Sequence, residues 1–123
     1  MAKTYGFDEF IDALGKLEKD FKSASNSLLE ETANLAVAET QLRTPVDTGT
    51  LRRSIARSDV KDYEVEVGTS IEYARYVEEG HRIGTSGFVP GIFMLKDGVT
   101  IAKTRFKVQA AKMFEDITKG FKI

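Results

Sequence analysis

A long apolar stripe that ends at a proline constrains the fold of this chain more than any other feature. Apolar residues recur at spacings of three and four, the period at which side chains share one face of an α-helix. They are Phe7, Phe10, Leu14, Leu17, Phe21, Ala24, Leu28, Leu35, Ala38 and Leu42. Pro45 lacks a backbone N–H and disfavours helical geometry in the residue before it. The sequence therefore predicts a helix over about residues 7–43, which would be about 50 Å long at 1.5 Å per residue.

This helix would be longer than a compact domain of 123 residues is wide. Residues 23–27 (Ser-Ala-Ser-Asn-Ser) have low helix propensity. Two alternatives follow: the helix breaks near residues 23–27, or one of its ends packs on a neighbouring chain. A coiled coil is disfavoured because too few aliphatic residues fill the middle of the stripe.

A turn is expected directly after the proline. Asp47 and Thr48 are residue types that accept backbone N–H groups at the start of a helix. Gly49 allows a close backbone approach, and Leu51 is expected in the core. The segment thus predicts a tight turn followed by a short helix or an extended segment over 51–55.

Alternating residues further along predict a small antiparallel sheet. Residues 55–60 and 63–68 can pair as a hairpin around a turn at Lys61-Asp62, because apolar and acidic side chains alternate over 63–67. Residues 92–95 (Ile-Phe-Met-Leu) predict a third strand.

The remaining segments predict two helices and a loop. A short helix is expected over about 71–79, capped by Thr69 or Ser70 and ended by Gly80. The glycines of residues 81–91 predict a mobile loop. A turn at Asp97-Gly98 then precedes an amphipathic helix over about 99–119.

The predicted fold class is α+β, in a single domain spanning residues 1–123. A long N-terminal helix and a C-terminal helix pack on a small, mainly antiparallel sheet of three to four strands. No apolar run approaches the roughly 20 residues that cross a membrane, and the N-terminus does not have the pattern of a secretion signal. Cysteine is absent, which excludes disulfides and cysteine metal sites and fits assembly in a reducing cytoplasm.

Charge is uneven although the net charge is −1. Residues 8–39 hold eight acidic residues and three lysines, whereas residues 103–122 hold six basic and two acidic residues. Opposite charge at the two ends could order contacts between subunits. Solvated helix faces are the simpler interpretation and the one preferred here.

Three kinds of chemistry are alternatives to structural roles for these residues. Asp47-Thr48-Gly49 is the active-site triplet of acid proteases, but a dimeric protease holds it in an all-strand barrel, and cations beside it would ionise both carboxylates of the shared pair. His81 with Glu78 and Glu79 does not have a recognised metal-ligand spacing. No glycine loop suited to phosphate follows a strand. No catalytic, cofactor or metal residue is therefore predicted.

Two sequence blocks together resemble a known family. The first block contains Arg43, Pro45, Asp47, Thr48, Gly49, Leu51, Arg52 and Ser54. The second contains Tyr73, Ala74, Tyr76, Val77, Glu78 and Gly80. Their order and separation resemble the pattern R-x-P-x-D-T-G-x-L-R-x-S and then Y-A-x-Y-V-E-x-G of the tail-completion, or head–tail joining (neck), proteins of long-tailed double-stranded DNA bacteriophages and prophages. Residues 81–82 and 87–95 are similar to one subgroup of that family.

The resemblance implies a structural protein of the virion, assembled in the host cytoplasm. Such a protein forms a ring, often of six copies, which completes the tail or joins it to the head connector. Its partners would be itself, the head connector and the tail tube proteins, and DNA would pass through the lumen without specific binding. A head-closure or tail-tube terminator protein of the same neck is the first alternative. A dimeric acid protease that uses Asp47-Thr48-Gly49 is the alternative from outside this class.

The site residues predicted from this reasoning form two groups. The structural signature comprises Pro45, Asp47, Thr48, Gly49, Leu51, Ser54, Tyr73, Ala74 and Gly80. The candidate interface comprises Arg52, Arg53, Arg57, Tyr76, Glu78, Glu79 and His81. Arginine heads suit the carboxylates of a partner protein as well as phosphates, and the partner-protein interpretation is preferred because DNA must slide through a conduit.

Overall fold

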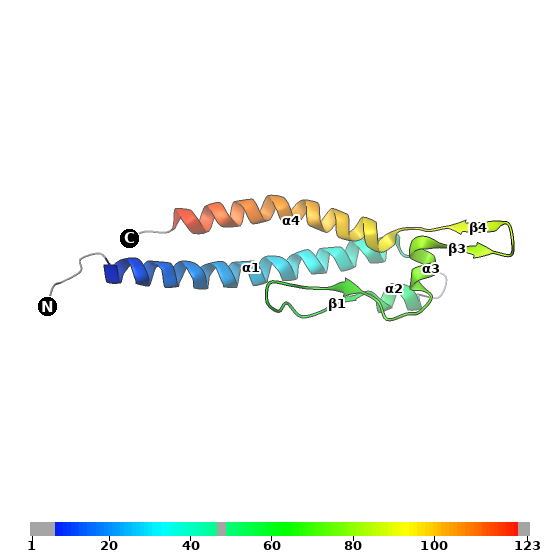
Figure 1. Cartoon of the computed structure of the whole chain (residues 1–123), viewed down its shortest axis with the longest axis horizontal. Coiled ribbons are helices and arrows are strands. Elements are labelled where there is room, and N and C mark those ends of the chain that lie inside the picture. The colour runs from blue at the N-terminus through cyan, green and yellow to red at the C-terminus, as the bar shows by residue number, and fades with distance from the viewer. Residues whose placement is uncertain (1–6, 47–48, 121–123) are drawn as a thin grey trace.

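The computed structural model describes residues 7–46 and 49–120, and two long helices form its frame. Helix α1 spans Phe7–Arg43 and helix α4 spans Met94–Lys119. They lie side by side and antiparallel along the long axis of a rod-shaped molecule (Figure 1). The short helices α2 and α3 and a β-hairpin gather at the end of the rod where α1 ends and α4 begins.

Helix α1 is continuous, so the break considered near residues 23–27 does not occur. Ser25 is buried, and with Leu28 it lines an apolar hollow together with α4 side chains. Packing of this kind supplies most of the stability of helices in proteins and outweighs a weak local propensity. The second alternative, an end of α1 covered by a neighbouring chain, is compatible with this geometry.

Small residues form a close contact between α1 and α4. Ala33, Ala36 and Thr40 of α1 are buried, whereas Leu42 is 71% exposed. On α4, Gly98 is buried and lies against Thr40: an added Cβ would overlap the Thr40 hydroxyl and lie 2.8 Å from its backbone nitrogen. The glycine is therefore needed for a close helix–helix approach.

The predictions for residues 92–98, at the start of α4, are wrong. Residues 92–95 do not form a strand, because α4 already begins at Met94, and Asp97-Gly98 lies within α4 rather than in a turn. The Met94 side chain is fully buried, and its sulfur accepts a hydrogen bond of 3.2 Å from the Thr44 hydroxyl. The apolar run thus supplies a core side chain at a helix start, a role that a short apolar run does not distinguish from a strand.

The predicted hairpin over residues 55–68 is present in shorter form. Strand β1 (Ala56–Arg57) pairs antiparallel with β2 (Val67–Gly68), and a further bridge joins Lys61 to Glu64. The two-residue turn is Asp62-Tyr63, one position later than predicted, with φ of 51° and 63°. Both residues have the left-handed geometry of a type I′ turn, which usually selects Asn or Gly.

Helix α3 (Ala74–Glu79) begins later than predicted and ends at Gly80 as predicted. The following segment is not the loop expected over 81–91. Strand β3 (Gly80–Ile83) pairs antiparallel with β4 (Gly87–Pro90). The hairpin projects at the end of the rod (Figure 1). Gly84 lies in the turn between the two strands and Gly87 begins β4, so these glycines mark a hairpin rather than a loop.

The α+β class is confirmed, with one difference in the sheet. The described residues form two separate two-stranded antiparallel sheets rather than one sheet of three to four strands. Helix α2 spans Thr50–Ser54. Within the described ranges, no helix is long and apolar enough to cross a membrane.

Candidate interaction site

The two signature blocks meet in one small core. Leu51 from the first block is 4% exposed and Ala74 from the second is 5% exposed. They pack with Ile55 and Met94 in a single cluster. The shared pattern therefore includes residues that hold α2 and α3 against the start of α4, which is a structural role.

Hydrogen bonds of Ser54, a polar residue of the signature, extend this connection. The Ser54 hydroxyl donates to the Leu51 carbonyl at 2.6 Å and lies 2.5 Å from the Thr69 hydroxyl. The Thr69 hydroxyl also accepts the backbone N–H of Ile71 at 3.1 Å. Thr69 thereby fixes the approach to α3, although the residue preceding that helix, Tyr73, gives no side-chain cap.

Helix α2 starts at a glycine with a left-handed backbone. Gly49 has φ of 70° and no side-chain cap hydrogen bond, and its carbonyl accepts the N–H of Arg53 at 3.0 Å. A Cβ at this position would lie 2.6 Å from the Arg53 guanidinium. Pro45 is half-buried. The predicted cap residues Asp47 and Thr48 lie outside the described residues.

The three arginines of the candidate interface have different surroundings. Arg52 is half-buried, with its Nη2 3.5 Å from the Thr44 carbonyl at the end of α1. Arg57 donates through Nε to the Asn34 side chain on α1 at 2.7 Å. Arg53 is exposed. Arg52 and Arg57 therefore help to hold their segment against α1, and Arg53 is the member of the three that is best placed to meet a partner.

Glu78 has a structural role that the sequence did not reveal. Its carboxylate accepts the backbone N–H groups of Leu95 at 2.8 Å and of Lys96 at 2.9 Å. Phe93, which precedes α4, has left-handed geometry and gives no side-chain cap. Glu78 therefore caps α4 from another helix, with an anion at the positive end of the helix dipole. Its distance along the chain explains why no local pattern pointed to it.

The remaining candidate interface residues lie where α3 joins the projecting hairpin. The rings of Tyr76 and His81 are 6.0 Å apart in an edge-on arrangement, and both side chains are exposed. Glu79 forms an exposed ion pair with Arg75 at 3.3 Å. Tyr73 is also exposed. Among the residues that the structure describes, no group of three His, Cys, Asp or Glu side chains could hold a metal ion.

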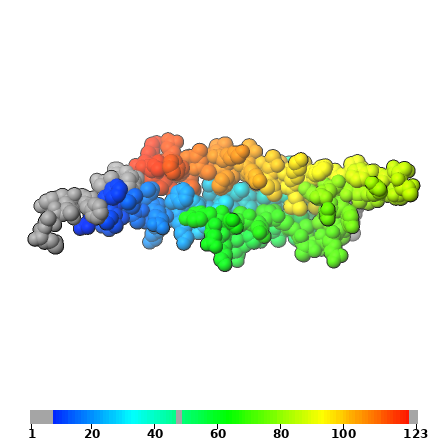
Figure 2. Space-filling view, viewed as in Figure 1, coloured from blue at the N-terminus to red at the C-terminus, as the bar shows by residue number. Residues whose placement is uncertain are grey.

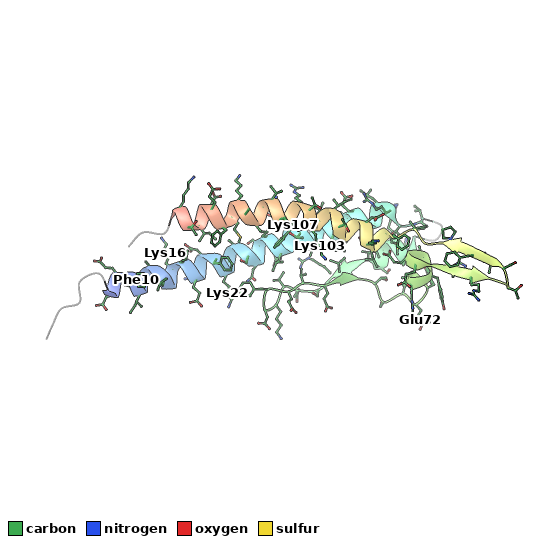
Figure 3. The ribbon with its side chains drawn as sticks, turned by 45° about the horizontal axis from the view of Figure 1, so that its top comes forward. Phe10, Lys16, Lys22, Glu72, Lys103 and Lys107 are labelled. Carbon is green, nitrogen blue, oxygen red and sulfur yellow. The ribbon has the colours of Figure 1, made fainter. Side chains whose placement is uncertain are left out.

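An apolar groove runs between the two long helices and residues 58–66, which we call the arm. The arm stands beside α1 as a separate ridge (Figure 2). The groove has a volume of about 690 Å³, and its apolar lining is Leu29, Ala33, Ala36, Tyr63, Val65, Val67, Val99, Ala102 and Phe106. Glu64 and Glu66 line it from the arm and Lys103 and Lys107 from α4, where Figure 3 labels both lysines. This groove was not predicted, because it depends on where the arm lies relative to the helices.

Large apolar side chains are also exposed toward the other end of the rod. On α1 they include Phe10, Ile11 and Leu14, and on α4 they include Val108 and Phe114. Figure 3 shows Phe10 near the start of α1. The stripe seen in the sequence is thus only partly covered within one chain.

The comparisons with known proteins give one match. A family model described as "Bacteriophage HK97-gp10, putative tail-component" matches residues 8–80, which is more than half of the 123 residues. The match includes both signature blocks and ends at Gly80, where the projecting hairpin begins. No curated protein and no solved structure matches the chain.

Proposed function

The chain belongs to the HK97 gp10-like family of bacteriophage tail components, and from this premise we propose that it is a structural protein of the virion that assembles with copies of itself at the head–tail interface. It would form a ring that completes the tail or joins it to the head connector. Partners would be its own copies, the connector and the tail tube proteins. DNA would pass through the lumen without sequence-specific binding, and assembly would take place in the host cytoplasm.

The observation that carries this proposal is the uncovered apolar surface of a rod built on two helices. Phe10 and Leu14 on α1 and Phe114 on α4 are exposed, although they belong to stripes with helical periodicity. An apolar stripe that one chain does not cover is buried when subunits associate. An elongated subunit with apolar surface along its length suits side-by-side packing around an axis. The expected stoichiometry is six copies, as is common in the tail-completion family that the sequence resembles.

A role without catalysis agrees with the two helices that flank the Asp47-Thr48-Gly49 triplet along the chain. The triplet lies between α1 and α2, whereas an acid protease holds this sequence within an all-strand barrel. We propose that the triplet serves the turn between the two helices. We also propose that the chain acts as one tail-completion-like domain, because α4 packs along α1 and starts from a cap supplied by Glu78.

A second neck role is kept as an alternative. A head-closure or tail-tube terminator protein would also form a ring from rod-like subunits with exposed apolar surface. A tube terminator remains on isolated tails, whereas a head-closure protein remains on isolated heads. The presence of the ring on isolated tails or on isolated heads therefore separates these two roles.

Gene deletion with complementation tests the proposal. Cells that produce the virus without this gene should yield filled heads and separate tails in electron micrographs, and the intact gene supplied in trans should restore joined particles. Normal infectious particles from the deletion would show that the neck assignment is wrong.

A further inference from the structure

One face of the projecting hairpin combines apolar surface with a cation. The strand register places Arg82 opposite Phe88 and Gly80 opposite Pro90. Opposite residues in an antiparallel pair, and residues two apart along a strand, share one face. Phe88 is 63% exposed, and Arg82 and Pro90 are exposed. We call Arg82, Phe88 and Pro90 the tip face. Residues 80–90 contain no Asp or Glu, so the tip face is apolar and positively charged.

The hairpin has features of a surface that a partner covers. A two-stranded hairpin alone is marginally stable in water, and this one extends beyond the ends of the paired helices (Figure 1). Its base is fixed to α3, because the N–H groups of Ile92 and Phe93 donate to the carbonyls of Val77 and Glu78 at 2.8 and 3.0 Å. A firmly held base with an exposed aromatic tip suits insertion into a complementary groove.

The groove beside the arm has the complementary chemistry. Its floor is apolar, and Glu64 and Glu66, which are exposed, line it from the arm. The arm, residues 58–66, contains four acidic residues and one lysine. None of the salt bridges between described side chains involves Glu64, Glu66 or Arg82. Lys103 and Lys107 line the groove from α4, so the acidic side of the groove is the arm.

We propose that the tip face of one copy docks in the groove of the next copy. Phe88 would lie on the apolar floor, and Arg82 would pair with Glu64 and Glu66. This inference rests on the proposed assembly of the chain with itself. The contact joins two different surfaces, so it is heterologous and generates a ring when the rotation between copies closes.

Charge reversal tests this contact with two complementary variants. The tip variant is Arg82→Glu, and the groove variant combines Glu64→Lys with Glu66→Lys. All three side chains are exposed, so thermal unfolding should match that of the unchanged protein, and circular dichroism would verify it. The control is Lys19→Glu, which reverses an exposed charge on α1 away from both surfaces. Each variant is expressed in cells that produce the virus from a genome without this gene. The infectious titre and the number of copies of the variant per particle are then measured.

The proposal predicts that the tip variant and the groove variant each lose incorporation and titre, while the control retains both. The chain that carries all three reversals should recover them, because every tip then meets a groove of opposite charge. Co-expression of the two defective variants should also recover them, because alternating copies are complementary at both surfaces. Normal particles from either variant alone, or a failure of both rescues, would overturn the contact. Normal particles from the deletion itself would instead remove the proposed neck function.

Discussion

The carboxylate of Glu78 accepts the backbone N–H of Leu95 at 2.8 Å, which ties α3 to the first turn of α4. The backbone N–H of Lys96 donates to the same carboxylate at 2.9 Å. We expect Glu78→Ala to lower the free energy of unfolding by about 1 kcal/mol, the usual cost of removing a capping side chain. Urea denaturation of the purified protein measures this.

The neighbouring Glu79 is the matched control for the cap. Its ion pair with Arg75 is exposed on both sides, and such pairs contribute about 0–1 kcal/mol. Glu79→Ala should therefore change stability less than Glu78→Ala. Equal losses from the two variants would contradict the capping role.

A second prediction concerns the close approach of the long helices. Gly98→Ala would place a Cβ against Thr40 of α1, including 2.8 Å from its backbone nitrogen. Overpacking of this kind costs about 1–3 kcal/mol, because backbone atoms cannot rotate away. Thermal unfolding should therefore occur at a lower temperature in this variant.

For Gly15 in α1 we expect that substitution by alanine has the opposite effect on stability. A Cβ added there meets nothing within 4 Å, so Gly15→Ala should stabilise the protein by about 0.5–1 kcal/mol through helix propensity alone. If Gly98→Ala were also stabilising, the helices would not approach as closely as the structure shows.

The backbone amide hydrogens of the projecting hairpin should exchange at different rates in the free protein and in assembled particles. In the free protein we expect faster exchange at residues 81–89 than in the buried part of α1, because an uncovered two-stranded hairpin opens easily. Exchange there should become slower in assembled particles. Hydrogen exchange read by mass spectrometry measures both states, and equally strong protection of the hairpin and α1 in the free protein would show that the hairpin needs no partner.

Arg52 and Arg53 should respond differently to charge reversal. Arg52 is half-buried, and its Nε is buried without a hydrogen-bond partner among the described atoms. Arg52→Glu would place a carboxylate near the Thr44 carbonyl, and we expect a loss of about 1–3 kcal/mol. Arg53 is exposed, so Arg53→Glu should change stability by less than about 0.5 kcal/mol.

Because Arg53→Glu should leave stability almost unchanged, this variant can be used to test the role of the arginine in assembly. A joining defect in Arg53→Glu at unchanged unfolding temperature would place a partner at this surface. A folding defect in Arg53→Glu, or none in Arg52→Glu, would contradict the surroundings described for the two side chains.

Much of the helical frame was predictable because its signals are local. The stripe and Pro45 gave α1 as Phe7–Arg43, and the predicted end of the next short helix at Gly80 is confirmed. Glycine signals were misleading where the reason for glycine was tertiary: Gly98 allows contact with Thr40 inside α4. The segment 81–91 was predicted as a loop because composition does not show strand pairing.

The interaction surfaces were less predictable than the frame. Glu78 caps a helix that begins at Met94, and local sequence patterns do not reveal such a distant partner. The groove depends on how the arm lies against α1 and α4, as its lining by Leu29, Tyr63 and Phe106 shows. Residue type indicates the candidate interface, but it does not separate Arg52, held at the end of α1, from the exposed Arg53.

Locating the protein within purified virions tests the central claim most directly. A small tag added after residue 123 can be labelled and imaged by cryo-electron microscopy, with the untagged virus as the control. The account predicts a single ring of several copies at the junction between head and tail. Label distributed along the tail tube, located at the distal tip, or absent from intact particles would contradict it.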